Sequence, residues 1–451
     1  MSHLQALASQ GLVLAVVLPL IAFTFLGLGM LIGHPPRERR VHQLLAVTHS
    51  ASLVFASAVL LGLGLEVLQP IRVDLGTLVA VRGYHFDLSL FGSFTGVLYL
   101  WLTVALCGLV GAFSAPYLHQ DEGYHRFYLL LVALTFGLSL IAVGAGLDLV
   151  FAGWEVVGLS SALLIAYFVR RPAPVAHGLM AFGIYRTTDV GLLLALVSLH
   201  HYAGTTSLDS LGELDPSASL WVGALIVFGA MGKGAIVPFT PWLPRAMEGP
   251  TPSSAIFYGA LSIHASPFLL LRITPILDQH AVLQAVVLGL GSLTALHAST
   301  VGRVQTDVKC CLGYASVAQV GLIWMWIGMG FYTIATLHLA SHAVMRTWQL
   351  LRAPSLLHDR HRLMQFLGTH VSRPRYSDGS GLLSRVRRKL YRFALERWYL
   401  DDLLGGITTL ARQGLNAVDA ADRRWARVLG GGGADAADEQ STVEPLEVRS
   451  Q

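Results

Sequence analysis

The chain has 451 residues, of which 54% are hydrophobic and 13% are charged, and its formal net charge is +4. Soluble domains carry about 25% charged residues, so this composition excludes an ordinary soluble enzyme and predicts an all-α integral membrane protein embedded in the lipid bilayer. The positive charge is carried by arginines in loops and in the C-terminal region, which fits a cytoplasmic membrane face and not a nucleic-acid partner.

Apolar windows of about 20 residues, long enough to cross a bilayer as helices, predict eleven transmembrane spans. They are residues 11–33, 44–69, 92–115, 126–144, 146–168, 177–200, 219–238, 252–275, 281–301, 307–329 and 331–352. No cleavable signal peptide is recognisable before the first span. Cys107, Cys310 and Cys311 fall inside these spans without disulfide or zinc-ligand spacing, so no metal site and no cofactor are expected in this chain.

Charged loops predict the orientation of the spans. Arginines in loops 34–43, 169–176 and 302–306 fall on one side if the spans alternate, whereas the acidic loop 201–218 falls on the other, with loop 70–91, whose alternating pattern predicts a hairpin. Arginine-rich loops remain in the cytoplasm. We therefore expect a bacterial inner (plasma) membrane protein with its N-terminus outside and its C-terminus in the cytoplasm. The acidic segment HQDEGYH is an exception on the arginine side.

The seventh predicted span holds a lysine, Lys233, within VFGAMGKGAIVPF. An ammonium at a bilayer centre costs at least about 2.5–3.5 kcal/mol on insertion scales, so such residues usually face a protein or water-lined interior. The neighbouring Gly232, Gly234 and Pro238 predict that this helix bends or breaks. Two interpretations remain: a lysine that supports packing or snorkels to the interface, and a lysine that relays protons or ions. We favour the second.

Further ionisable side chains fall in the other predicted spans. Glu155 is in the fifth, and Arg186 and Asp189 lie three residues apart in the sixth, as an intrahelical pair or as part of a relay. The later spans hold more candidates for the same pathway: His264, with Tyr258 nearby, then Lys309, and then His338, His342 and Arg346 at helical spacing. A carboxylate beside a membrane lysine stabilises its ammonium, so changing their separation would load or unload a proton. His49 and His297 are expected to be satisfied interior groups.

The composition changes after residue 353. Residues 379–430 combine apolar and basic side chains at helical spacing, as in RVRRKLYRF, and predict an amphipathic basic helix followed by a weaker second one. Such helices fit a packed surface element, a membrane-surface anchor or a dock for a cytoplasmic partner. Residues 431–451 are polar and expected to be disordered.

Six segments resemble, in order, the motifs of one family of membrane proteins. They are GYHRFYLLL, GWEVVGLSSALLIAYF, FGIYRTTDVG, MGKGAIVPFTPWLPRAMEGPTPSSAI, VQTDVKCCLGYASVAQVG and LHLASHAVMR. Over about residues 92–352 the chain thus resembles the antiporter-like membrane subunits of respiratory complex I and of Mrp sodium/proton antiporters. The resemblance implies a cation-translocating (H⁺ or Na⁺) subunit with a broken seventh helix, in which Glu155 pairs with Lys233 and His264 continues the pathway.

The resemblance also implies how the chain is divided. The expected parts are three N-terminal helices (1–120), a five-helix half-channel unit (121–275), a truncated second unit (276–353), the cytoplasmic amphipathic tail (354–430) and a disordered end (431–451). The chain departs from the family where Tyr258 replaces a histidine and where Arg346 replaces a lysine. Nothing after residue 352 resembles the family's twelfth helix, so a shortened second unit is expected.

Within this family the chain is most similar to the membrane subunit (DabB type) of DAB-type inorganic carbon transporters. That similarity implies a large soluble zinc-containing partner resembling a carbonic anhydrase (DabA type) at the cytoplasmic face, with cation flow energising uptake of CO₂ or bicarbonate. Two alternatives stay open: a proton-translocating subunit of a modular NADH-quinone oxidoreductase or Mrp-type antiporter, and a non-conducting membrane anchor for a soluble enzyme. The chain itself is not expected to be an enzyme. Lys233 discriminates, because an anchor does not need it.

Overall fold

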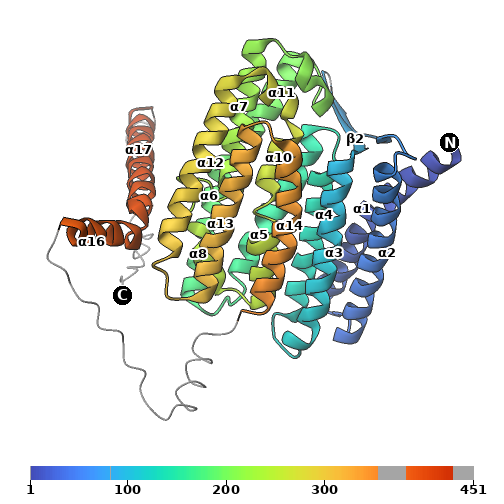
Figure 1. Ribbon diagram of the computed structural model, residues 1–451, viewed down its shortest axis with the longest axis horizontal. Coiled ribbons are helices and arrows are strands. Elements are labelled where there is room, and N and C mark those ends of the chain that lie inside the picture. The colour runs from blue at the N-terminus through green and yellow to red at the C-terminus, as the bar shows by residue number, and fades with distance from the viewer. Residues whose placement is uncertain (1, 82, 354–381, 430–451) are drawn as a thin grey trace. The chain divides into compact units, whose positions relative to one another are not determined.

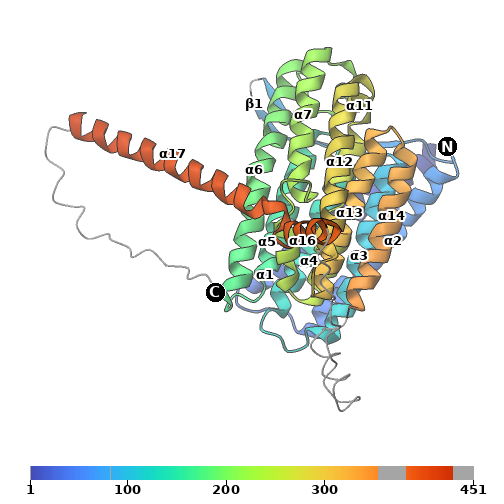
Figure 2. The ribbon, with the colours of Figure 1, turned by 60° about the vertical axis from the view of Figure 1, so that its left-hand side comes forward.

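The computed structural model describes residues 2–81, 83–353 and 382–429. They belong to two compact units, Met1–Trp398 and Tyr399–Gln451. In the first unit, long helices stand side by side as a bundle (Figures 1 and 2). Its first half contains α1 (Ser2–Leu31), α2 (Glu38–Gly64), β1 (Ile71–Val81), β2 (Tyr84–Gly92), α3 (Phe94–Tyr117), α4 (Tyr124–Val143), α5 (Leu147–Ile165) and α6 (Pro172–Ala203). The helix α4 is the centre of the bundle, since 83% of its apolar window is buried.

The second half of the bundle begins with shorter elements. They are η1 (Leu208–Glu213), α7 (Pro216–Lys233), α8 (Trp242–Arg245), η2 (Ala246–Glu248), α9 (Thr251–Ser253), the π-helical η3 (Ser254–Ala260), α10 (Ala265–Arg272) and α11 (Thr274–Gln279). Three long helices follow: α12 (Ala281–Gly302), α13 (Val308–Gly328) and α14 (Tyr332–Leu351). Five prolines between residues 238 and 252 remove backbone donors, which explains why the chain is segmented between α7 and α10.

Eight helices among the described residues are long and apolar enough to cross a membrane, namely α1 to α6, α12 and α13. This agrees with a multi-pass helical membrane protein. Three of the predicted spans, 219–238, 252–275 and 331–352, are not among the eight. In the structure α7 ends at Lys233, the second of these segments is divided among α9, η3 and α10, and α14 carries two histidines and an arginine. The total of eleven spans and the broken seventh helix stay predictions.

One end of the bundle carries the predicted hairpin. The strands β1 and β2 pair antiparallel, with Ile71 opposite Gly92 and Val81 opposite Tyr84, so the prediction from the alternating pattern is confirmed. A guanidinium N–H of Arg72 donates to the carboxylate of Asp209 on η1. The hairpin and the acidic loop therefore lie at the same end of the bundle, as predicted.

At the opposite end, the acidic segment HQDEGYH contacts both neighbouring arginine-bearing loops. Nδ1 of His119 lies 2.6 Å from Glu38 at the start of α2, and NH2 of Arg170 lies 2.9 Å from the carboxylate of Glu122. The hydroxyl of Tyr167 donates to Asp121 at 2.6 Å. The acidic segment HQDEGYH thus pairs with the two neighbouring arginine-bearing loops at this end of the bundle.

Two helical hairpins of the bundle share one packing device. A Cβ added to Gly137 on α4 would lie 2.9 Å from the carbonyl oxygen of Gly153 on α5, and one added to Gly291 on α12 would lie 2.7 Å from the carbonyl oxygen of Gly321 on α13. Only glycine permits backbones to approach this closely. Both hairpins are therefore held together by direct backbone contact.

The predicted tail is helical where the structure describes it. The helix α16 (Leu382–Leu395) belongs to the first unit and carries a basic run, with Val386, Leu390 and Phe393 exposed. In the second unit, α17 (Leu400–Leu429) is a long amphipathic helix. The expectations for residues 354–381 and 431–451 lie outside the described residues, and the predicted domain boundaries stay predictions.

Candidate functional site

Lys233 is the last residue of α7 and is fully buried in the bundle. Small neighbours let the backbone reach this depth. A Cβ at Gly232 would lie 2.1 Å from the hydroxyl of Thr188 on α6, and one at Gly234 would lie 2.3 Å from the hydroxyl of Ser266 on α10. The two glycines therefore allow the end of α7 to pack closely against both helices.

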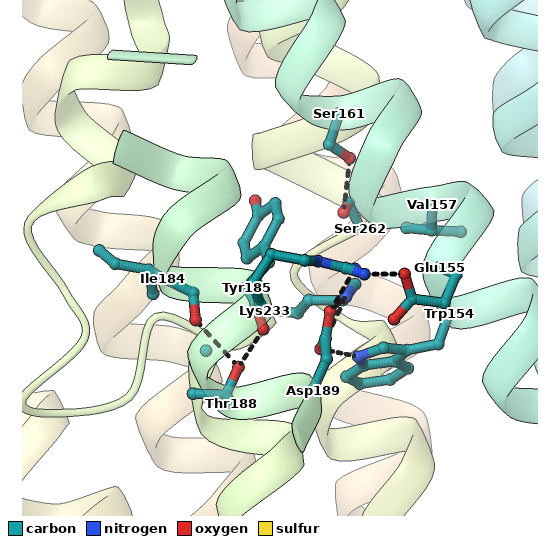
Figure 3. A network of polar contacts seen from close by, with 12 residues as sticks. Trp154, Glu155, Val157, Ser161, Ile184, Tyr185, Thr188, Asp189, Lys233 and Ser262 are labelled. Carbon is teal, nitrogen blue, oxygen red and sulfur yellow. Dashed lines mark hydrogen bonds and ion pairs between the residues drawn. The ribbon is translucent and has the colours of Figure 1, made fainter. Parts of the chain in front are cut away.

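The carboxylate in contact with Lys233 belongs to Asp189, in the middle of α6. The ammonium Nζ lies 3.1 Å from Oδ1 and 3.2 Å from Oδ2 of Asp189, which is 3% exposed. The indole N–H of Trp154 also donates to Oδ1, at 2.6 Å. Asp189 thus accepts from two helices, α5 and α7, besides its own (Figure 3).

Arg186 joins Asp189 to the second carboxylate of the site. Its guanidinium donates to Oδ2 of Asp189 at 2.7 Å and to Oε2 of Glu155 on α5. No hydrogen bond or ion pair joins Glu155 directly to Lys233 among the described side chains; Arg186, one turn before Asp189, bonds Glu155 instead. Two acids and two bases balance in charge, which is the condition under which buried ions are tolerated.

Exposure decreases along this network. The side chains of Arg186 and Glu155 are 36% and 29% exposed, whereas those of Asp189 and Lys233 are 3% and 0% exposed. Oε1 of Glu155 and Nε of Arg186 have no hydrogen-bond partner among the described residues. The outer pair thus retains one acceptor and one donor, while the inner pair is enclosed.

Aromatic rings surround the ammonium of Lys233. Nζ lies 4.6 Å from the centre of the Trp154 ring and 4.9 Å from that of Tyr185, within the range of cation–π attraction. On a further side Gly158 of α5 leaves space, since a Cβ there would lie 3.1 Å from Nζ. The ammonium therefore contacts one carboxylate and two aromatic ring faces, and the missing side chain of Gly158 on α5 leaves room for it.

A second polar cluster joins the bend before α10 to α14. Nε2 of His264 lies 2.8 Å from Nδ1 of His342, and both rings are buried. Arg346, one turn beyond His342 and 4% exposed, donates to its Nε2 at 3.4 Å. Because Nε2 of His342 accepts, its Nδ1–H donates to His264. The structure thus brings together three residues that the sequence placed in two separate spans.

His338 flanks this cluster and has its own partners. Its Nε2–H donates to Oε1 of Gln319 at 2.8 Å, and the indole N–H of Trp326 donates to its Nδ1 at 3.2 Å. Its ring centre lies 6.2 Å from that of His342. His338 is therefore in ring contact with the histidine pair, with both nitrogens engaged by α13.

A pair of buried hydroxyls links α5 to the bend before α10. The hydroxyls of Ser161 on α5 and Ser262 are 3.1 Å apart, and both side chains are buried (Figure 3). Ser161 follows Gly158 by one helical turn, and Ser262 precedes His264 by two residues. Hydroxyls donate and accept at once, so this pair supplies a polar contact between two elements that also carry members of the two clusters.

The remaining candidates lie apart from these contacts. Lys309 is half-buried near the start of α13, and no hydrogen bond or ion pair joins it to either cluster among the described side chains. The side chain of Tyr258 lies outside the described residues. His49 contacts the carbonyl of Leu45 at 3.0 Å. His297 contacts the hydroxyl of Thr240 at 3.1 Å.

Sequence reasoning missed the uncharged members of the site. Trp154 is adjacent to Glu155 in the GWE motif, and its position next to an acid in an apolar span was the available signal. Gly158 and Ser161 resemble ordinary small residues of membrane helices. Their roles depend on which helix faces which, and spacing along one helix does not contain that information.

The sequence matches a known family. The family described as "NADH:quinone oxidoreductase/Mrp antiporter, TM" matches residues 145–370, half of the chain. The chain is 32% identical over 375 residues to the chloroplastic NAD(P)H-quinone oxidoreductase subunit 5 of Nephroselmis olivacea, covering 79% of this chain and 57% of that protein. It is 31% identical over 283 residues to NADH-quinone oxidoreductase subunit L of Rhodobacter capsulatus, covering 58% of this chain and 40% of that protein. The chain thus spans about half the length of these relatives.

Two solved structures share the fold. The Mrp complex from Dietzia sp. DQ12-45-1b matches with a TM-score of 0.62 and 22% identity, covering 77% of this chain and 37% of that one. The membrane-bound sulfane sulfur reductase, an archaeal respiratory membrane complex, matches with a TM-score of 0.66 and 19% identity, covering 75% of this chain and 70% of that one. The helical bundle therefore shares its fold with chains of these two complexes.

Proposed function

The chain belongs to the NADH:quinone oxidoreductase/Mrp antiporter membrane family, and from this premise we propose that it is the proton-translocating membrane subunit of a larger complex. The observation that carries the proposal is the buried pair of Lys233 and Asp189, which Arg186 joins to the partly exposed Glu155. A buried hydroxyl pair and a buried histidine pair in the same unit supply further polar groups.

Charge balance explains how such a network would move one proton at a time. Glu155, Arg186, Asp189 and Lys233 are together neutral when all are ionised. If Lys233 gives up its proton, the network carries one net negative charge in a region where an uncompensated ion costs several kcal/mol. Uptake of a proton from the more exposed side, at Glu155, restores neutrality. Release from Lys233 and uptake at Glu155 are therefore coupled.

The direction of release follows from the neighbouring groups. The hydroxyls of Ser161 and Ser262 and the imidazoles of His264 and His342 can each accept one hydrogen and donate another. Arg346 next to His342 keeps its own proton, so it acts as a fixed charge. We propose that the proton leaves Lys233 toward His264, and that Arg346 limits how long His342 stays protonated.

Substitution of Lys233 tests this function. Lys233→Arg keeps the positive charge but does not release its proton at accessible pH, and Lys233→Met removes the charge and its insertion cost. Both variants should insert and assemble at wild-type yield, and both should abolish proton-dependent activity in sealed membranes, normalised to the assembled complex. Under the alternative of a non-conducting anchor, full activity would persist in both variants, and that result would end the proposal.

The comparisons bear on which kind of complex the chain would join. The relatives named above are subunits of quinone oxidoreductases and the similar folds come from an Mrp complex and a sulfur reductase complex, which favours a redox or antiporter complex over inorganic carbon uptake. The finer possibility, cation-driven CO₂ or bicarbonate uptake with a zinc-containing carbonic-anhydrase-like subunit, rests on sequence resemblance alone. Identifying what co-purifies from mild detergent separates them: redox subunits, antiporter subunits or a zinc protein.

The tail is our candidate for docking that partner. The described helix α16 carries five basic residues and no acidic one within Leu382–Leu395, and α17 exposes apolar side chains such as Leu410 and Trp425. Deleting residues 379–451 should release the partner while the bundle stays in the membrane. If the partner still co-purifies at full yield, it docks on the membrane loops instead.

A further inference from the structure

The helices α2 and α3 leave a groove between them that the proposed proton pathway does not use. Its volume is about 210 Å³, below the roughly 300–1,000 Å³ typical of sites for drug-sized ligands. The residues that line it are His42, Leu45, Ala46, His49, Ser50 and Leu53 of α2, with Val104, Ala105, Gly108, Leu109, Gly111 and Ala112 of α3. A groove of this size with a mostly apolar lining fits a hydrocarbon chain.

The groove lies on the outer surface of the bundle. Ala46 and Ser50 are exposed, and Leu109 on the opposite wall is 55% exposed. The hollow exists because small side chains occupy positions where larger residues would fill it, with Ala46 on α2 and Ala105 and Ala112 on α3. Since both helices are apolar enough to cross a membrane, this surface faces the hydrocarbon region or another membrane segment.

A positive charge stands at one end of the groove. Arg39, Ala46 and Leu53 are spaced by seven residues along α2, so they share one helical face. Arg39 therefore lies one turn before His42, on the face that lines the groove, and it is exposed. Arg40 is also exposed, but one residue further it points about 100° away around the helix.

The nearby acid is already committed elsewhere. The carboxylate of Glu38 accepts from Nδ1 of His119 at 2.6 Å and from the backbone N–H of Gln120 at 3.1 Å. No ion pair joins an acid to Arg39 among the described residues. This end of the bundle also holds the arginine-bearing loops, where lipid headgroups would lie. The mouth of the groove is thus cationic, and its lining further along is mostly apolar.

We propose that this groove binds one phospholipid with an anionic headgroup, with an acyl chain along Ala46, Leu53 and Leu109 and its phosphate near Arg39 and His42. An anionic phospholipid matches the site because its charged headgroup would lie at Arg39 while its acyl chain continues along the groove. A zwitterionic lipid such as phosphatidylcholine would fill the groove but gain less from Arg39, because its headgroup has no net charge. A neighbouring apolar helix would leave Arg39 beside hydrocarbon.

The test uses the full chain in nanodiscs that contain equal amounts of phosphatidylglycerol and phosphatidylcholine, with retained lipids counted by native mass spectrometry. The wild type should retain one phosphatidylglycerol in preference to phosphatidylcholine by about five-fold, the factor that one arginine near an anionic surface supplies. Arg39→Ser should remove this preference. The matched control Arg40→Ser, adjacent in sequence but on another face, should keep it.

A second pair of variants tests whether the apolar part of the groove holds the acyl chain. Ala46→Phe and, from the opposite wall, Ala112→Phe should each reduce retention of both lipids while the protein remains monodisperse; two variants guard against one that fails to fold. Equal loss in Arg39→Ser and Arg40→Ser, equal retention of the two lipids by the wild type, or unchanged retention in both phenylalanine variants would overturn the proposal. So would a photo-crosslinker at Ser50 that captures a protein segment instead of lipid.

Discussion

The ammonium of Lys233 lies 3.1 Å from a carboxylate oxygen of Asp189, and the two side chains are 0% and 3% exposed. Glu155, which the family resemblance would place against Lys233, is bonded to Arg186 instead. The two acids of the site therefore have different tasks. Asp189 is the only acid bonded to Lys233 among the described residues, whereas Glu155 is the more exposed acid, at which we propose that the network takes up a proton.

This difference predicts unequal effects of the two neutral amides. Asp189→Asn strands the ammonium of Lys233, and breaking a buried pair in this way costs about 3–5 kcal/mol. Glu155→Gln leaves Arg186 bonded to Asp189 and should cost much less stability, yet it should still abolish proton-dependent activity. Thermal unfolding in detergent and transport in sealed vesicles measure the two effects. Equal loss of stability in both variants would contradict the assignment.

Trp154 offers a test of how Asp189 is held. Trp154→Phe keeps a ring beneath the ammonium but removes the N–H that donates to Asp189 at 2.6 Å. A hydrogen bond to a charged group contributes about 1.5–3 kcal/mol, so this variant should be destabilised by that order and should retain reduced transport. The matched control is Trp101→Phe, which removes an indole bond to Ser57 at 2.9 Å outside the site. The control should leave transport unchanged; an equal loss of transport in both would refute a specific role for Trp154.

Gly158 tests the space beside the ammonium. A Cβ added there would lie 3.1 Å from Nζ of Lys233 and 3.5 Å from the guanidinium of Arg186. Gly158→Ala should therefore shift the lysine by a few tenths of an ångström and lower transport, although alanine favours a helix by about 1 kcal/mol over glycine. Gly183→Ala on α6, where nothing lies within 4 Å of the added carbon, should stabilise without affecting transport. Full transport in both variants would show that the gap is not needed.

Orientation is open to direct measurement. In a background without Cys107, Cys310 and Cys311, a single cysteine at Ser210 should react with a membrane-impermeant maleimide in intact cells. A single cysteine at Arg171, at the other end of α6, should react only after the membrane is opened, because arginine-rich loops remain in the cytoplasm. The reverse pattern would invert the proposed topology.

Sequence reasoning found the charged members of the site for a simple physical reason. A lysine, an acid or a histidine in an apolar span is costly unless it has a partner. Each charged residue of the site could therefore be recognised individually from the sequence: Glu155, Arg186, Asp189 and Lys233. Their pairing was not visible. Whether Lys233 meets Asp189 or Glu155 depends on the rotation of α5 and α6 about their axes, and a change of one residue in packing would exchange the partners.

The fold shows the same division between local and long-range information. The hairpin of β1 and β2 followed from alternation along one short segment, and it formed as expected. The segment between α7 and α10 was expected to contain a break and one further helix, but its five prolines divide it into several short pieces. Hydropathy averages over a window of about 20 residues and does not register where each turn ends.

The glycine contacts at Gly137–Gly153 and Gly291–Gly321 have a mechanical consequence. At these positions neither glycine places a side chain between the two backbones, so we expect the α4–α5 and α12–α13 hairpins to resist deformation there. The more easily deformed part of the bundle is then the set of short elements between α7 and α10, with Lys233 at one end and His264 at the other. If a neighbouring subunit distorts the bundle, we expect the short elements between α7 and α10 to move more than the two hairpins.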